Sequence, residues 1–207
     1  HLEHLEDDIV NSGKVGGFNA IKFLRELGKM LSEPTSSIRV TTKWDGAPAI
    51  VCGRTPDNGA FFVGTKSVFA KTHPKLMFNN NMIDSVYNGN LAIILKECLK
   101  YFSQIGITGV IQGDLLYTNQ TKTIKSINNQ QCVTFTPNTI TYAVPVDSMV
   151  GQQIINSKIG IVFHTSYTGK NMRSMNATFG VDTKNLNGTK DVYVSSATFE
   201  DASGAAN

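Results

Sequence analysis

The fold is decided in ten residues, Thr41-Thr42-Lys43-Trp44-Asp45-Gly46-Ala47-Pro48-Ala49-Ile50. One β-rich run, 38–43, precedes an Asp-Gly pair, and a second run, 47–52, follows it. Asp-Gly is typical of a tight turn, because Gly takes a positive φ without strain and Asp tolerates one. The segment therefore predicts two strands joined by a turn, with Lys43 at the end of the first strand.

Lys43 stands where a lysine can act as a nucleophile. Lysine attacks only when it is neutral, so its pKa must fall from about 10.4 through burial or through neighbouring cations. The apolar side chains of Trp44 and Ile50 could bury it, and Lys66 and Lys71 could supply positive charge. The same ten residues also suit an ordinary hairpin whose turn follows an exposed lysine.

The rest of the chain predicts short strands and two amphipathic helices. Apolar residues recur at three- and four-residue spacing in 18–31 and in 91–102, which indicates a helix in each range. Turn residues at 56–59 separate the second run from the next. Further strands are expected at 60–64, 109–117, 132–136, 139–144, 160–165 and 192–195. This order predicts an α+β fold of two packed, mainly antiparallel sheets with flanking helices.

Composition sets wide bounds on the function. The 207 residues are 41% hydrophobic and 17% charged, which is ordinary for a globular protein. No apolar run approaches the roughly 20 residues of a bilayer span, so no membrane role is expected. The net charge of +3 is compatible with nucleic acid as a partner.

Compartment and domain organisation follow from the same reading. Three cysteines at unrelated spacings and an acidic opening segment favour a cytoplasmic protein with reduced thiols. We expect one domain over 1–207, in which the polar segment from about 182 to 207 is a linker or a truncated tail. The sequence leaves the oligomeric state open.

Lys43-Trp44-Asp45-Gly46 resembles motif I of the covalent nucleotidyltransferases, the superfamily of ATP-dependent DNA ligases, RNA ligases and mRNA-capping enzymes. The resemblance implies the ligase adenylation-domain fold and a lysine that attacks the α-phosphate of ATP or GTP. The lysyl-nucleotide then passes its nucleotide to a 5′-phosphate end of DNA or RNA. The chain is also similar to a bacteriophage branch that opens with His-Leu-Glu-His-Leu-Glu-Asp, which implies a viral source and the host cytoplasm.

Three later segments resemble further family motifs in the family's order. Thr65-Lys66-Ser67 is similar to the basic segment after motif I, and 109–116 looks like motif III with Asp114 in place of the usual Glu. Residues 139–144 resemble the strand whose aromatic residue stacks on the base. The resemblance implies ATP and Mg²⁺ as cofactors, Lys43 as nucleophile and Asp114 at the metal. It implies nucleotide contacts from Thr42, Trp44, Asp45, Gly46, Lys66 and Tyr142.

The chain departs from the family at several motifs. Pro48 stands where DNA ligases usually carry Arg, and the nearest match to motif IV has Ile159 for the acid and His164 for the lysine. Motif V is not recognisable in these residues. The main interpretation is an ATP-dependent polynucleotide ligase or a near relative. Two alternatives stay open: a phage nucleic-acid-binding or structural module that kept the fold without the reaction, and AMP transfer to a protein.

Overall fold

The structure, a computed structural model, describes residues 5–33, 40–41, 43–186, 189–197 and 199–200. The chain divides into two compact units. Unit 1 comprises 1–42 with 198–207, and unit 2 comprises 43–197. The expectation of one domain over the whole chain stays a prediction.

Unit 1 contains a kinked helix and a pair of two-residue strands. Helix α1 (Leu5–Ser32) breaks its helical conformation at Gly13, where φ is 54°. A Cβ on Gly16 would lie 1.9 Å from the carbonyl oxygen of Asp8, so the two parts of α1 pack closely where this glycine lies. Strand β1 (Val40–Thr41) pairs antiparallel with β11 (Phe199–Glu200). The helix expected at 18–31 is confirmed as part of α1.

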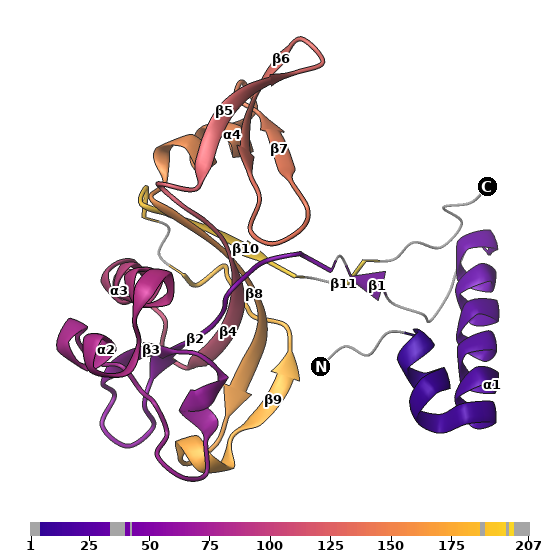
Figure 1. Cartoon of the computed structure of the whole chain (residues 1–207), viewed down its shortest axis with the longest axis horizontal. Helices are drawn as coiled ribbons and strands as arrows, with labels where there is room; N and C mark the ends of the chain where they lie inside the picture. The colour runs from indigo at the N-terminus through magenta and orange to yellow at the C-terminus, as the bar shows by residue number, and fades with distance from the viewer. Residues whose placement is uncertain (1–4, 34–39, 42, 187–188, 198, 201–207) are drawn as a thin grey trace. The chain divides into compact units, whose positions relative to one another are not determined.

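A six-stranded sheet organises unit 2. Its order is β10-β8-β4-β2-β3, with β9 also paired to β8 (Figure 1). All neighbours are antiparallel except β10 and β8, which run parallel. Its strands are β2 (Ala49–Arg54), β3 (Phe61–Gly64), β4 (Val110–Thr118), β8 (Ile159–Thr168), β9 (Asn176–Phe179) and β10 (Val192–Ser196).

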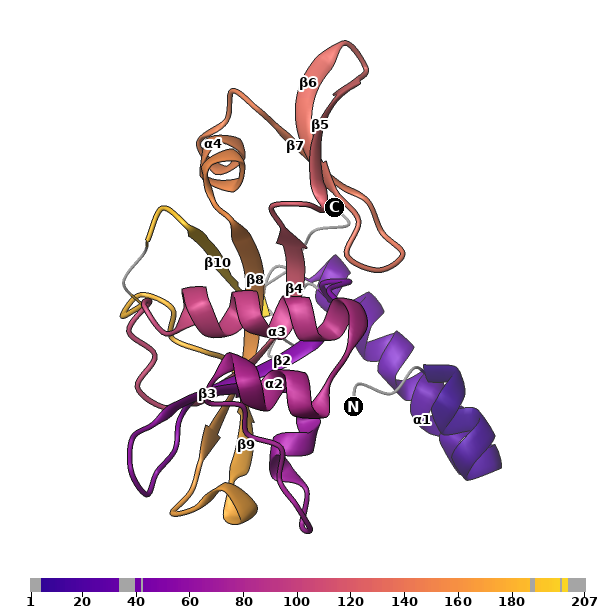
Figure 2. The same ribbon diagram turned by 60° about the vertical axis from the view of Figure 1, so that its left-hand side comes forward.

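Helices α2 (Asn80–Val86) and α3 (Gly89–Phe102) lie against one face of this sheet (Figure 2). The core beneath them takes alternate residues of the central strands, as the two-residue period of a strand requires. Its members include Ile50, Cys52, Ile111, Leu115, Ile161 and Phe163 with Leu95, Cys98 and Phe102. Helix α3 confirms the helix expected at 91–102.

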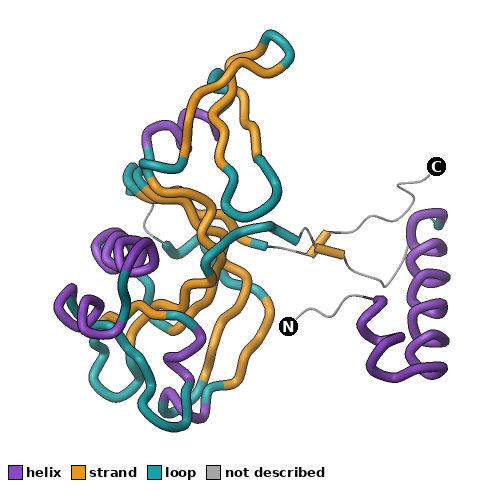
Figure 3. The backbone as a smooth tube through the Cα atoms, in the orientation of Figure 1, coloured by secondary structure: helices purple, strands orange, loops and turns teal. Residues whose placement is uncertain are grey.

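A second, three-stranded sheet stands beside helix α4 (Met149–Asn156) in unit 2 (Figure 3). Its order is β5 (Lys122–Ile127), β6 (Gln130–Phe135) and β7 (Tyr142–Pro145), all antiparallel. Asn128 and Asn129 join β5 to β6 with positive φ at both residues, which is the backbone of a tight hairpin turn. A second core joins the two sheets through Leu116, Tyr117, Val133, Phe135, Ile154 and Val162.

The α+β class with mainly antiparallel sheets is confirmed. The strands expected at 109–117, 132–136, 160–165 and 192–195 are found as β4, β6, β8 and β10, and the strand expected at 139–144 is the shorter β7. Strand β10 lies within the segment from about 182 to 207 that was expected to be a linker or a tail. The sequence reading missed β5, β9, α2 and α4, although Asn79 and Ser148 cap the two helices as typical N-cap residues do.

The tight turn expected at Asp45-Gly46 is wrong. Strand β2 pairs with β3 and β4, and β1 pairs with β11, so among the described residues of the two β-rich runs no hairpin joins them. Of the strand expected at 38–43, the described residues show only Val40 and Thr41 in strand conformation, and Lys43 lies outside it. The turn at 56–59 is confirmed, and Gly59 has a φ of 70°.

None of the helices in the described ranges has the length and apolar content that crossing a bilayer requires.

Lys122 fastens β5 to the end of α4 and generates the first prediction. Its ammonium donates to the carbonyl oxygens of Ile154 (2.6 Å), Ile155 (2.8 Å) and Ser157. Lys122→Met removes all three donors, and we expect a loss of about 2 kcal/mol in the free energy of unfolding measured with urea. Lys125→Met, three residues along the same exposed strand, is the control and should stay within about 0.5 kcal/mol. Equal losses in both variants would contradict this role.

Candidate functional site

The Lys-Trp-Asp-Gly segment runs alongside the central strand β4. Ala47 N–H donates to the Leu115 carbonyl (3.0 Å), and Leu115 N–H donates to the Pro48 carbonyl (3.1 Å). These bonds extend the β2–β4 pairing, in which Ala49 lies opposite Asp114. A Cβ on Gly46 would lie 2.5 Å from the Cβ of Asp114, so only glycine fits here without a shift. Close approach, rather than a turn, is therefore the physical reason for Gly46.

Asp45 ties this segment to the loop before β7. Its carboxylate accepts hydrogen bonds from the Asn138 side chain (3.0 Å) and from the backbone N–H groups of Thr139 (2.7 Å) and Ile140 (2.8 Å). The Asp45 N–H donates to the Tyr142 hydroxyl (2.8 Å). The Ile140 bond first, then those from Asn138 and Thr139, lower the pKa of the Asp45 carboxyl, because they stabilise its charged form. The sequence reading missed Asn138.

Trp44 and Tyr142 belong to a series of packed aromatic rings. Ring centroids are 5.4 Å apart between Trp44 and Tyr142 and 5.4 Å apart between Tyr142 and Phe135. The half-buried Trp44 and Tyr142 pack against the core that joins the two sheets. The base-stacking role of Tyr142 stays a prediction. The contacts show that the ring also holds the Lys-Trp-Asp-Gly segment in place.

The two lysines of the predicted site are exposed. Lys43 lies directly before Trp44, and its charge is among the causes that lower the pKa of Asp45. The expected burial of Lys43 by apolar neighbours is wrong, because residues 43–48 do not fold into a hairpin over it. Lys66 opens the 3₁₀ helix η1 (Lys66–Phe69) that follows β3. Thr42 lies outside the described residues.

Asp114 faces away from α2 and α3, on the side of the sheet that also carries Val162. Opposite Gln112 and Gly113, strand β8 contains a bulge: Gln112 pairs with Thr165 and Gly113 with Phe163, which leaves His164 as the extra residue. A bulge re-aims a side chain and is frequent beside active sites. Here His164 Nε2 lies 3.6 Å from Asp114 Oδ1.

These residues form a polar strip between apolar packing on either side, which we define as Gln112, Asp114, His164, Thr165 and Tyr167. The Tyr167 hydroxyl donates to Gln112 Oε1 (2.6 Å), and His164 Nδ1 lies 2.7 Å from Thr165 Oγ1. Asp114 and His164 keep about a quarter of their side-chain surface exposed (25% and 23%). The structure therefore brings together Gly46 and Asp114, two of the residues that the sequence singled out, and it adds His164 beside Asp114.

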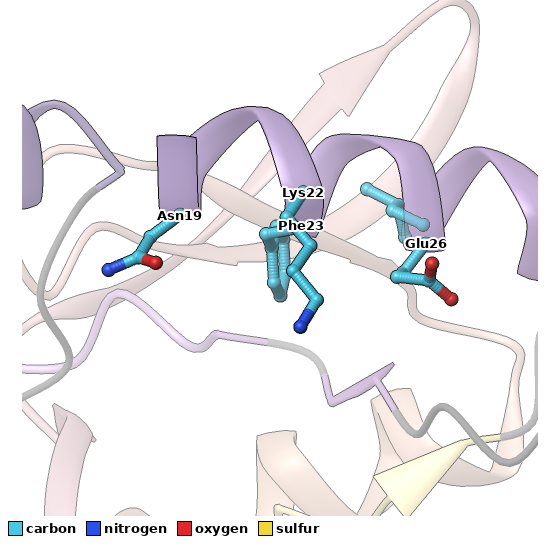
Figure 4. A pocket seen from close by; sticks show the side chains of 5 residues that line it. Asn19, Lys22, Phe23 and Glu26 are labelled. Atoms are coloured by element: carbon cyan, nitrogen blue, oxygen red, sulfur yellow. The ribbon is translucent and has the colours of Figure 1, made fainter. Parts of the chain in front are cut away.

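Shallow hollows lie along α1 in unit 1. One is lined by Asn19, Lys22, Phe23, Glu26 and Leu27 (Figure 4). Lys29 and Glu26 form an ion pair (3.1 Å) beside it. The residues that line these hollows include none of the candidate nucleotide or metal ligands from the sequence analysis. The polar strip is thus the candidate site.

The fold and the strip define an α+β protein with a lysine-bearing segment held against a carboxylate on the central strand. The chain belongs to the family described as "Family of unknown function (DUF6267)", which matches residues 1–207. No curated protein and no solved structure matches the chain. The function is therefore argued from the site itself.

The contact between Gly46 and Asp114 generates the second prediction. In Gly46→Ala the added Cβ cannot coexist with Asp114, so residues 44–47 must shift away from β4. Trp44 is the only tryptophan of the chain, so its fluorescence reports the shift directly. We expect a red-shifted emission in a protein whose sheet remains folded by far-UV circular dichroism. Gly109→Ala, where a Cβ meets nothing within 4 Å, is the control and should leave the emission unchanged.

The Asp45 bonds generate a pH prediction. Because the folded-state pKa of Asp45 is lowered, these bonds stabilise the folded protein above the ordinary value of 3.8, and the contribution is lost as the pH falls through the lowered value. The amide proton signals of Thr139 and Ile140 should therefore titrate below pH 3.8. In Asp45→Asn the two signals should no longer follow this titration. Titration of the wild-type signals above the ordinary value would contradict the assignment.

Proposed function

We propose that this chain is an ATP-dependent, polynucleotide-ligase-like nucleotidyltransferase with the adenylation-domain fold, in which Lys43 carries the AMP. The observation that carries the proposal is the attachment of the Lys-Trp-Asp-Gly segment to β4, where Gly46 rests on Asp114. Two segments more than 60 residues apart in sequence, both chosen for their likeness to family motifs, meet at one place. An ordinary hairpin after an exposed lysine would not bring them together.

In the proposed reaction the neutral Lys43 amine attacks the α-phosphorus of ATP. A phosphorus–nitrogen bond forms, the bond from the α-phosphorus to the bridging oxygen breaks, and pyrophosphate leaves. The nitrogen releases a proton to solvent. Since Lys43 is exposed in the structure, neighbouring cations rather than burial would have to favour its neutral, nucleophilic form.

In this proposal Asp114 would hold a divalent cation, and the exposed Lys66 would contact phosphate. A bound Mg²⁺ would neutralise charge that develops on the departing pyrophosphate. In the described part of the chain no group of three or more His, Cys, Asp or Glu side chains gathers at one point. A Mg²⁺ held by one or two protein ligands fits this arrangement, because such ions take their other ligands from water and substrate phosphates.

The acceptor in this proposal is a 5′-phosphate end of DNA or RNA, and the compartment is the cytoplasm, that of the host if the source is viral. The mildly basic net charge of +3 suits a nucleic-acid partner. Transfer of AMP to a protein is the same first step with a different acceptor.

One observation favours the second candidate, a nucleic-acid-binding or structural module without the reaction. Ile159, at the position of the motif IV acid, is fully buried in the core beneath α3. A carboxylate at that position would face the core and not the polar strip. If motif IV is needed for transfer, this segment does not supply it in the usual way.

Labelling with ATP distinguishes the two candidates. Incubation with ATP labelled at the α-phosphate and a divalent cation should leave label on the denatured protein, whereas γ-labelled ATP should leave none. The adduct should be labile in acid, added pyrophosphate should remove it, and a nicked duplex with a 5′-phosphate should discharge it. Lys43→Ala should abolish labelling.

Lys43→Arg should abolish labelling too, because a guanidinium keeps its proton at working pH. The matched control is Lys125→Arg on the exposed strand β5, which should label like the wild type. Folded wild-type protein that takes no label from ATP or GTP would favour the binding module. Labelling that survives in Lys43→Arg would assign the nucleotide to another residue.

A further inference from the structure

We infer that Asp114 and His164 together form a divalent-cation site that takes Mn²⁺ or Co²⁺ in preference to Mg²⁺. The inference deepens the proposed function, since the ion would lie beside the Lys-Trp-Asp-Gly segment, and it rests on that proposal for its role in the reaction. The binding itself rests on the two side chains alone.

The spacing of the two side chains suits a shared ion. His164 Nε2 and Asp114 Oδ1 are 3.6 Å apart, which exceeds the reach of a hydrogen bond. Two ligands at about 2.1 Å from one metal lie roughly 3.0–3.4 Å from each other, so a small side-chain rotation closes the gap. Within the described ranges no other side chain forms an ion pair with Asp114. Both side chains are partly exposed, which leaves room for water or phosphate as further ligands.

Thr165 provides a hydrogen-bond partner for the imidazole nitrogen of His164 that does not face Asp114. His164 Nδ1 lies 2.7 Å from Thr165 Oγ1, so in the tautomer with its proton on Nδ1 that proton is donated to the hydroxyl, and Nε2 is an acceptor facing Asp114. Metal-binding histidines commonly donate their other N–H in this way. The bulge supplies the geometry, because it places the consecutive residues His164 and Thr165 together opposite Gln112.

Ligand chemistry predicts which ion is preferred. Mg²⁺ favours oxygen ligands and dehydrates reluctantly, whereas imidazole nitrogen raises affinity for transition metals. In the usual order of affinities Co²⁺ binds such a site more tightly than Mn²⁺. The departure from the family at the motif IV lysine therefore has a chemical consequence: His164 changes the metal preference of the site.

The test is a Mn²⁺ titration of the nucleotide-free protein, followed by the electron paramagnetic resonance signal of free Mn²⁺. Wild-type protein should bind one equivalent, and His164→Ala or Asp114→Asn should each weaken binding by about tenfold or more. Matched controls are His73→Asn, at an exposed loop residue with φ 57°, and Asp147→Asn, at an exposed aspartate. Both should bind like the wild type. Equal binding in wild type and both site variants, or no binding in folded wild type, would overturn the inference.

A second variant at His164 tests the metal preference, and it keeps the inference testable if His164→Ala does not fold. His164→Asp gives a site of two carboxylates, so it should bind Mn²⁺ but lose the preference for Mn²⁺ over Mg²⁺ in a competition titration. An unchanged preference would show that the imidazole is not a ligand. Lys43→Ala should bind Mn²⁺ as tightly as the wild type does, but it should form no covalent adduct with AMP. The metal site and the nucleotidyl transfer can therefore fail separately.

Discussion

The site depends on one steric constraint, the close approach of Gly46 to Asp114. A backbone without a Cβ lets the segment before β2 stay paired to β4, and that pairing carries Trp44 to the core between the sheets. Asp45 then reaches the loop at 138–140 and accepts three hydrogen bonds from it. Residues 44–47 thus link the two sheets of unit 2. Any side chain at position 46 would disturb these contacts together.

The sequence singled out Gly46 and Asp114, which the structure brings into contact, but it did not predict the backbone that joins them. The helix 91–102 and the central strands were evident because apolar residues there follow the periods of buried elements. The Asp-Gly turn was wrong because Gly serves close packing as well as positive φ, and sequence alone does not separate the two uses. Strand β5 was missed because its side chains are mostly exposed, although Asn128-Asn129 is the turn signal that marks its hairpin.

His164 shows what sequence could not supply. It was identified as a departure from a family motif, yet its relation to Asp114 depends on a bulge opposite Gln112 and Gly113 that no residue pattern announces. Asn138 likewise acquires its part only because the loop folds back to Asp45. The α+β class followed from local patterns, whereas the polar strip follows from strand register. Lys43 itself is exposed, so its proposed reactivity depends on what binds beside it.

We propose that Lys43 is the residue that accepts AMP. The most direct measurement is peptide mass spectrometry after incubation of the wild-type protein with ATP and Mn²⁺, under conditions that preserve a phosphorus–nitrogen bond. Fragmentation should place a single adenylyl group on Lys43. An adduct on Lys66 or another lysine, or no adduct in folded protein supplied with ATP and metal, would contradict the account.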